Sequence, residues 1–235
     1  MRAVAAADRR DPDEVRLDVA HGLVAIPLNR NRRATSVMGV GRGLRVKVNA
    51  NLGTSPDYAD VDMELAKLAA AQDAGADSVM DLSTGGDVAD IRRRVMDACR
   101  VTVGTVPIYE VAAAAARAHG DIARMTADEM LAGIRRHGED GVDFVTVHCG
   151  VSRRIAESEA LRRRVCGIVS RGGMFLAHWM RRHKQENPLL ERFDELIDIA
   201  REFDMTLSLG DGLRPGAIAD AMDGCQVEEL LILAD

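Results

Sequence analysis

The residues best suited to chemistry in this sequence follow short apolar runs. The stretch Thr206–Gly216 reads T-L-S-L-G-D-G-L-R-P-G, so Asp211 and Arg214 come directly after an apolar run that stops at a glycine. In parallel α/β enzymes, strands that end in such turns ahead of a helix present polar groups to a ligand. A local ion pair between the two side chains is the alternative, and their position favours ligand binding.

A second turn of this kind is S-R-G-G, Ser170–Gly173. Two adjacent glycines between a strand and a helix allow backbone N–H groups to converge at the positive end of the helix. With a hydroxyl and a guanidinium added, the turn could hold a phosphate. An ordinary tight turn with a surface arginine at position 171 remains the alternative.

Two ring side chains also follow expected strands. His148 is followed by Cys149 and Gly150, where an imidazole could act as an acid or base or hydrogen-bond a ligand. A hydrogen-bonded structural histidine is the alternative. Tyr109, one of two tyrosines, is expected at a strand end, where it either meets a ligand or is partly buried.

The first two strands carry further candidates. Asn49 and Asn51 lie two residues apart beyond the first strand, so both amides point to one side, toward a ligand or into a turn. Met80 is an expected core residue, and Asp81 is a candidate polar contact at the second strand end. Asp87 is expected to cap the helix that follows.

Strands and helices alternate along the chain. The expected strands are residues 44–48, 78–82, 101–108, 142–147, 167–169 and 205–209. The expected helices are residues 11–20, 60–74, 88–99, 110–119, 127–137, 153–164, 174–183 and 188–203, with another from about 217 to the end. This alternation predicts parallel β/α units.

The fold class predicted is α/β, an incomplete β/α barrel of the TIM type with about six of eight strands. A doubly wound sheet would usually show G-x-G-x-x-G after the first strand, and that pattern is absent. We expect a lead-in segment at 1–43, with a polar turn at Asn29–Arg33, and a partial barrel at 44–235. An open arc leaves exposed sheet edges, so either something else, such as a second chain, completes it or it closes in a non-standard way. The exposed edges also predict self-association.

Composition narrows the function classes. Aromatic residues make up only 3% of the chain, so aliphatic side chains must form the core. The net charge of −6 and the lack of a basic stripe argue against nucleic-acid binding, and the sequence has no membrane-length apolar run. The four cysteines form no C-x-x-C pair, and His178 and His183 have the wrong spacing for a shared metal. We therefore predict a cytoplasmic protein with reduced cysteines and no metal ligands.

Six longer motifs point to one family. They are V-N-A-N-L-G-T-S, S-V-M-D-L-S-T-G-G-D, V-G-T-V-P-I-Y, V-T-V-H-C-G-V, G-I-V-S-R-G-G and L-S-L-G-D-G-L-R-P-G-A-I-A-D-A. Together they resemble the ThiC family of phosphomethylpyrimidine synthases in thiamine biosynthesis. The resemblance runs in register from about residue 20 to residue 230.

The resemblance implies an atypical radical S-adenosylmethionine lyase on a β/α barrel. The family converts 5-aminoimidazole ribotide to hydroxymethylpyrimidine phosphate, using a 4Fe-4S cluster that cleaves S-adenosylmethionine to a 5′-deoxyadenosyl radical. Matching motif to motif places the substrate contacts at Asn51, Met80, Tyr109, His148, Ser170, Arg171, Gly172, Asp211, Gly212, Leu213 and Arg214. No catalytic residue is assigned.

The sequence departs from the family pattern in its metal ligands. The family has two further strands with a Glu and two zinc-binding His, and a tail with C-x-x-C-x-x-x-x-C; these are absent here. The first interpretation is therefore a family member that binds the ribotide, is inactive alone, and needs a second chain for metal and cluster. A non-catalytic ribotide-binding homologue or structural remnant is the second. A related radical enzyme such as hydroxybenzimidazole synthase is the third.

Overall fold

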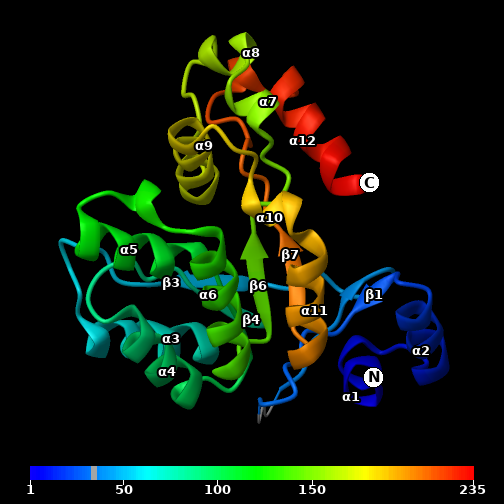
Figure 1. Cartoon of the computed structure of the whole chain (residues 1–235). Helices are drawn as coiled ribbons and strands as arrows, with labels where there is room; N and C mark the ends of the chain where they lie inside the picture. Colours follow the sequence, from blue (N-terminus) through cyan, green and yellow to red (C-terminus); the bar gives the residue numbers. More distant parts are fainter. Residues whose placement is uncertain (33–35) are drawn as a thin grey trace. The chain divides into compact units, whose positions relative to one another are not determined.

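The computed structural model describes residues 1–32 and 36–235. Figure 1 shows an α/β protein in which helices and strands alternate after a helical N-terminal segment. The strands are β1 (Val24–Ala25), β2 (Val40–Gly41), β3 (Asn49–Leu52), β4 (Ser78–Asp81), β5 (Thr102–Thr105), β6 (Phe144–Val147) and β7 (Thr206–Leu209). The α-helices are α1 (Arg2–Asp8), α2 (Pro12–Ala20), α3 (Val61–Asp73), α4 (Val88–Ala98), α5 (Pro107–His119), α6 (Ala127–Glu139), α7 (Arg153–Ala156), α8 (Glu159–Arg162), α9 (Arg171–His183), α10 (Pro188–Glu191), α11 (Phe193–Phe203) and α12 (Gly224–Ala234). Two 3-10 turns are η1 (Ile122–Arg124) and η2 (Ile218–Asp220).

The main sheet has five strands in the order β3-β4-β5-β6-β7, and its strands run parallel. Asn51 lies opposite Met80, and Gly104 opposite Phe144. Strands β1 and β2 form a separate antiparallel pair. The parallel α/β prediction is confirmed, and the order of the strands follows the order of the chain.

The chain divides into two compact units. Unit 1 consists of Met1–Thr105, Arg135–Val145 and Ile199–Thr206; unit 2 consists of Val106–Ile134, Thr146–Asp198 and Leu207–Asp235. The predicted boundary after residue 43 stays a prediction. Among the described residues, no helix combines the length and apolar character needed to cross a bilayer.

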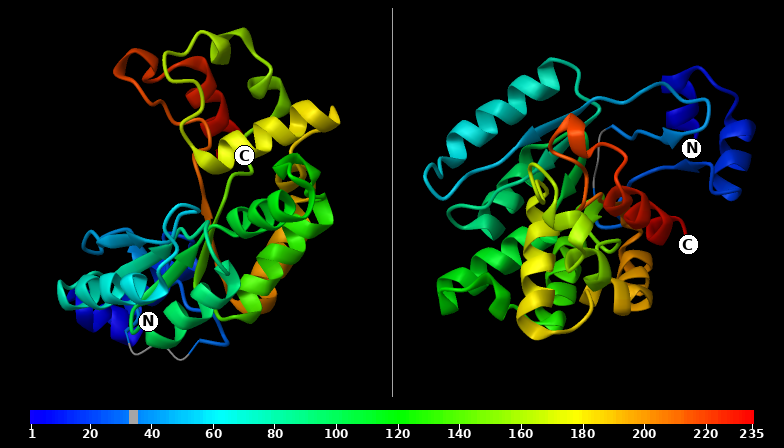
Figure 2. Two further views of the ribbon diagram at one scale, coloured as in Figure 1. Left: turned by 90° about the vertical axis from the view of Figure 1, so that its left-hand side faces the viewer. Right: turned by 90° about the horizontal axis from the view of Figure 1, so that it is seen from above.

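In unit 1, helices α3 and α4 lie side by side along the sheet. Asp60 and Asp87 cap them by accepting hydrogen bonds from the backbone N–H groups of Met63 and Asp90, as the sequence predicts. Helices α1 and α2 pack beside the β1–β2 pair in the N-terminal segment (Figure 2). A small apolar cluster of its own supports that segment: Val4, Ala5 and Val15, with Ile26, Val37 and Leu44 against them.

In unit 2, helix α9 packs against α5, α7 and η1, and α12 packs against α7 and α8. Figure 1 shows α12, in red, beside these two short helices. The core contains aliphatic and sulfur side chains, with one tryptophan whose indole N–H donates to the carbonyl oxygen of Met125 (2.7 Å). The prediction that aliphatic residues form the core is confirmed.

The prediction of six strands is wrong in two places. Residues 44–48 were expected to form the first strand, but that strand begins at Asn49. The Asp77 carboxylate accepts a hydrogen bond from the Val48 N–H group (2.8 Å) and pairs with Arg45, while Lys47 pairs with Asp8. Val46 is 89% exposed and Val48 61%, so these two valines do not face a core.

The expected strand at 167–169 is also absent. The Asp220 carboxylate accepts hydrogen bonds from the N–H groups of Val165 (3.1 Å) and Cys166 (3.4 Å), so these donors are not available to a neighbouring strand. Gly167 then takes a left-handed conformation with φ of 57°, which breaks an extended run. The chain is thus held by a side chain just before residue 167 and turns at that glycine.

Three helix predictions need correction. Residues 153–164 form two helices, α7 and α8, because the Ser158 hydroxyl accepts a hydrogen bond from the Leu161 N–H group and starts a second helix. The helix expected from 217 onward is the short turn η2 followed by α12. Residues 188–203 likewise form α10 and α11. In the predicted turn at 29–33, Arg33 lies outside the described residues.

Asp143 holds together two segments of unit 1, those that contain Asn29 and Val103. Its fully buried carboxylate accepts hydrogen bonds from the N–H groups of Asn29 (3.1 Å) and Val103 (2.8 Å). We expect Asp143→Ala to lower the free energy of unfolding by about 2–5 kcal/mol, since two buried donors lose their acceptor. Urea denaturation measures this. Asp73→Ala, at a side chain 78% exposed, is the control and should change stability by less than about 0.5 kcal/mol; equal effects would contradict the role of Asp143.

Candidate functional site

The predicted site residues fall into two groups, one in each unit. Asn51 and Met80 belong to unit 1. The remaining nine belong to unit 2: Tyr109, His148, Ser170, Arg171, Gly172, Asp211, Gly212, Leu213 and Arg214. Each group is therefore described within its own unit.

In unit 1, the sheet register places Asn51 directly opposite Met80. Asn49 and Asn51 lie inside strand β3, which corrects the expectation that they follow a strand. Their amides are joined, since Asn49 Nδ2 donates to Asn51 Oδ1 (2.9 Å). Asn51 is exposed and Met80 half-buried, so both can meet a ligand from adjacent strands.

In unit 2, His148 comes directly after β6, as predicted, and is 4% exposed. Its ring packs between two glycines: a Cβ at Gly172 would overlap the imidazole, and one at Gly210 would lie 3.3 Å from Cδ2 and Nε2. Nδ1 is buried and has no hydrogen-bond partner among the described residues. Burial, with the nearby Arg214 adding and Asp211 opposing, lowers the pKa of His148 to about 4.

The S-R-G-G turn begins helix α9. Ser170 is 1% exposed and caps the helix, because its hydroxyl accepts a hydrogen bond from the Gly173 N–H group (3.2 Å). The helix therefore starts at Arg171, three residues earlier than predicted. The N–H groups of Arg171 and Gly172 lie in the first turn of the helix, where no carbonyl oxygen of the helix itself can accept from them. They are therefore available to an anion.

Arg171 lies over the ring of Tyr109, with its guanidinium carbon 5.1 Å from the ring centroid. Phe175, one helical turn along α9, meets the same ring edge to face at 6.1 Å. Tyr109 stands in the first turn of α5 rather than at a strand end, because Pro107 starts that helix early. Burial raises the pKa of Tyr109, with Arg171 and Arg214 acting in the opposite direction, so the phenol is protonated near neutral pH.

The D-G-L-R turn follows β7. Asp211 and Arg214 are exposed and form the local ion pair that the sequence allowed (3.9 Å), which contributes little in water. Gly212 and Leu213 are buried, and their N–H groups donate to the carboxylate of Glu229 (2.7 and 2.8 Å). The side chains at positions 211 and 214 are therefore the polar groups that this turn offers to a ligand.

The two turns touch through backbone alone. A Cβ at Gly173 would overlap the carbonyl oxygen of Gly212, and a Cβ at Gly212 would lie 3.1 Å from the Gly173 Cα. This approach requires a glycine at position 173, and a Cβ at position 212 would also overlap the Val151 side chain. The contact brings together the two turns that the sequence singled out independently.

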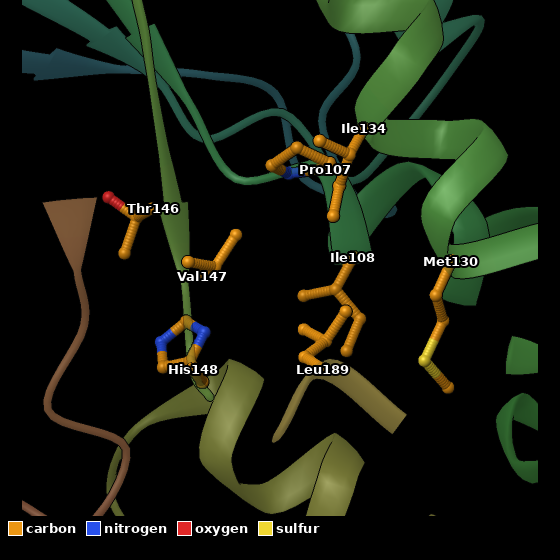
Figure 3. A pocket seen from close by; sticks show the side chains of 8 residues that line it. All are labelled: Pro107, Ile108, Met130, Ile134, Thr146, Val147, His148 and Leu189. Carbon is orange, nitrogen blue, oxygen red and sulfur yellow. The ribbon is translucent and has the colours of Figure 1, made fainter. Parts of the chain in front are cut away.

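A cavity also lies beside His148, lined by Pro107, Ile108, Met130, Ile134, Thr146, Val147 and Leu189 (Figure 3). Its volume is about 10 Å³, the room of a single water. Figure 3 shows Thr146 on one side of β6, Val147 on the other side toward Ile108 and Leu189, and the His148 ring at the end of the strand. Ligand pockets have volumes of several hundred Å³, so this cavity is a packing feature.

Two supporting residues were missed by sequence reasoning. Asn187 is fully buried, and its amide donates to the carbonyl oxygens of His148 (2.9 Å) and Val151 (3.0 Å), which fixes the turn after β6. Glu229 holds the turn after β7. Both residue types are usually exposed, so nothing in the sequence marks these two as buried.

Metal ligands are absent from the described part of the chain. Within residues 1–32 and 36–235, no group of three or more His, Cys, Asp or Glu side chains could hold a metal ion. All four cysteines are free; Cys99, Cys149 and Cys225 are buried and Cys166 is exposed. Burial raises the pKa of the Cys149 thiol to about 11, which opposes the thiolate that iron binds. These residues do not fit an iron–sulfur cluster.

Comparison with known proteins decides the family. The family model described as "Radical SAM ThiC family" matches residues 1–235, the whole chain. The chain belongs to the radical SAM ThiC family. The resemblance seen in its motifs is thereby confirmed.

The chain is 52% identical over 235 residues to phosphomethylpyrimidine synthase of Moorella thermoacetica, covering 100% of this chain and 54% of that protein. It is 50% identical over 233 residues to phosphomethylpyrimidine synthase of Methanopyrus kandleri, with 99% and 54% covered. It is also 47% identical to 5-hydroxybenzimidazole synthase BzaB of Moorella thermoacetica, with 100% and 55% covered. This ThiC chain thus spans about half the length of the curated relatives it matches.

The buried His148 makes a prediction about pH. Its folded pKa of about 4 lies below the ordinary value of 6.5, so between these pH values the unfolded chain binds a proton that the native state does not. Stability therefore falls as the pH drops below 6.5, by about 2 kcal/mol at pH 5. Urea denaturation at pH 7 and pH 5 measures the loss. The free energy of unfolding of His148→Gln should fall less between pH 7 and pH 5 than that of the wild type. An equal fall in the variant and the wild type would contradict a neutral buried imidazole.

The contact between the S-R-G-G and D-G-L-R turns leads to a prediction about stability. Gly173→Ala places a methyl group against the Gly212 carbonyl oxygen, so the backbone must shift and stability should fall by about 1–3 kcal/mol. Thermal or urea unfolding checks this. Gly224→Ala is the control, because nothing lies within 4 Å of its added Cβ at the start of α12. Should both alanines be tolerated equally, the two turns are not held in contact.

Proposed function

We propose that this chain carries the ribotide-binding part of a phosphomethylpyrimidine synthase, which converts 5-aminoimidazole ribotide to hydroxymethylpyrimidine phosphate. One observation carries the proposal: two turns joined through Gly173 and Gly212 bear Arg171 and Arg214 close to Tyr109 and His148. A phosphate ester with a polar heterocycle needs such groups, a cation for its phosphate and neutral hydrogen-bonding rings for its remainder. The names of the relatives support the same assignment.

The phosphate is proposed to bind at the start of α9. Arg171 supplies a guanidinium, and the N–H groups of the first helical turn point out along a helix of 13 residues. The Tyr109 ring restricts the guanidinium of Arg171, because the guanidinium carbon packs over the ring at 5.1 Å from its centroid. Ser170 shapes the turn from its buried cap position, and Gly172 leaves room for the imidazole.

The remainder of the ribotide is proposed to meet His148, Tyr109 and the D-G-L-R turn. The imidazole is neutral at pH 7 and has an unused buried nitrogen, so it can exchange a hydrogen bond with the ligand without adding charge. The Tyr109 phenol is a protonated donor. Asp211 and Arg214 add an acceptor and a donor. Asn51 and Met80, which lie opposite each other in unit 1, are proposed as ribotide contacts of that unit.

The radical half of the reaction is not assigned to these residues. The family uses S-adenosylmethionine and a 4Fe-4S cluster, and its pattern adds a zinc site, but the described residues contain no ligand set for either metal centre. We therefore propose binding roles only, and a second polypeptide as the source of the metal ligands. The five-stranded sheet is proposed to form part of a β/α barrel, and the cytoplasm is the proposed location.

A second candidate is 5-hydroxybenzimidazole synthase, because the chain is 47% identical to the protein of that name. We expect both enzymes to take the same ribotide, so binding alone does not separate them. Product analysis does, after the chain is combined with the part of either relative that it does not cover. A non-catalytic ribotide-binding homologue would bind the ribotide and give neither product.

Isothermal titration calorimetry with 5-aminoimidazole ribotide tests the proposal. We expect the chain to bind the ribotide weakly, and Arg171→Gln to weaken binding by about 1.5–3 kcal/mol through loss of a charge-assisted phosphate contact. Arg163→Gln is the matched control, at a side chain 78% exposed on the same unit.

Two outcomes would contradict this. No heat at millimolar ribotide would remove the substrate site from this chain. An affinity unchanged by Arg171→Gln would leave that side chain with its stacking contact to Tyr109 alone.

A further inference from the structure

Glu229 is a buried acid in the middle of helix α12, only 1% exposed. Its two carboxylate oxygens accept hydrogen bonds from consecutive backbone N–H groups, Oε1 from Gly212 (2.7 Å) and Oε2 from Leu213 (2.8 Å). Both donors belong to the turn between β7 and η2. One side chain therefore holds two successive peptide groups of the D-G-L-R turn.

Burial of this carboxylate is unfavourable by itself. Desolvation raises the pKa of Glu229, and the nearby Asp211 acts in the same direction; the two N–H groups and Arg164 lower it. An apolar residue on α12 would avoid this desolvation, but it would leave both N–H groups without an acceptor. The position therefore serves the conformation of the turn.

The same side chain contacts the other parts of the site. The Glu229 stem limits the space at Gly150, where an added Cβ would lie 2.9 Å from Glu229 Cγ, so α12 packs on the turn that follows His148. On its other side, Gly212 backs onto Gly173 at the start of α9. Displacing Glu229 would thus release the D-G-L-R turn, which backs onto the S-R-G-G turn through Gly212.

We propose that Glu229 is a positioning residue for ribotide binding, holding the D-G-L-R turn against the S-R-G-G turn so that Arg214 and Arg171 face one ligand. The inference rests on the proposed ribotide-binding function. It also specifies how the turn takes part: the N–H groups of Gly212 and Leu213 are already occupied, so the ligand meets the side chains of Asp211 and Arg214.

The experiment compares Glu229→Ala, Glu229→Gln and Glu228→Gln. Glu228 is the matched control, since it is the adjacent carboxylate, it is 25% exposed, and it pairs with the exposed Arg154 (2.6 Å) instead of with the D-G-L-R turn. Calorimetry with the ribotide should show about 10- to 100-fold weaker binding for Glu229→Ala, from loss of hydrogen bonds to a charged group. Glu229→Gln keeps one acceptor oxygen and should recover part of the affinity. Glu228→Gln should stay within about twofold of the wild type.

Amide hydrogen exchange gives the second measurement. In the wild type, the Gly212 and Leu213 amides should exchange slowly, and both should exchange faster in Glu229→Ala while Glu228→Gln leaves them unchanged. If Glu229→Ala does not fold, Glu229→Gln decides the question by the same two measurements.

The outcomes separate the two proposals. Wild-type binding that the Glu229 variants leave unchanged overturns the positioning role and keeps the ribotide site. Absence of wild-type binding overturns the proposed function and the positioning role with it. Partial recovery of affinity by glutamine, together with amide exchange that speeds up at Gly212 and Leu213 in Glu229→Ala, supports Glu229 as the residue that sets the turn, because the exchange measurement reports on that turn itself.

Discussion

The contact between Gly173 and Gly212 is the constraint on which the candidate site of unit 2 depends. The two backbone segments approach so closely that a Cβ at Gly173 would overlap the Gly212 carbonyl oxygen, and a Cβ at Gly212 would lie 3.1 Å from the Gly173 Cα. This contact fixes the start of α9 relative to the turn after β7. Ser170 can then cap the helix from a buried position, and Arg171 lies over Tyr109. A ligand site built from two loops is fixed here by packing of main chain on main chain.

Buried polar side chains hold the loops of both units in place. Asp143 accepts two backbone N–H groups in unit 1, and Glu229 and Asp220 each do the same in unit 2, while Asn187 ties down the carbonyls after β6. The chain has few aromatic residues to pin its loops by bulk. Hydrogen bonds to side chains provide the alternative, at the expense of desolvating charged groups. Such loops are stiff where the acceptors are present, which suits residues that must hold a small anionic ligand.

Much of the fold could be predicted, and the failures have physical reasons. The order of strands and helices followed from apolar periods and capping residues such as Asp60 and Asp87, which act over a few residues. At the strand expected at 44–48, the Asp77 carboxylate takes the Val48 N–H group; the strand expected at 167–169 directly follows two N–H groups held by the Asp220 carboxylate, and it begins with Gly167 in a left-handed conformation. Such acceptors lie 29 and 55 residues away in sequence, so no local pattern shows them. Tyr109 was misplaced because Pro107 began its helix early.

The sequence by itself determined the family, the parallel β/α order and the identity of the turns that bear Ser170, Arg171, Asp211 and Arg214. These follow from residue types at fixed spacing, a property of local chain segments. Only the tertiary structure decided which groups remain free for a ligand. It assigned the N–H groups of Gly212 and Leu213 to Glu229 and left a nitrogen of His148 unused. The physical reason is that burial and long-range hydrogen bonding depend on which segments meet in space. The side chains that form these hydrogen bonds are of types that are usually exposed, so the sequence does not mark them.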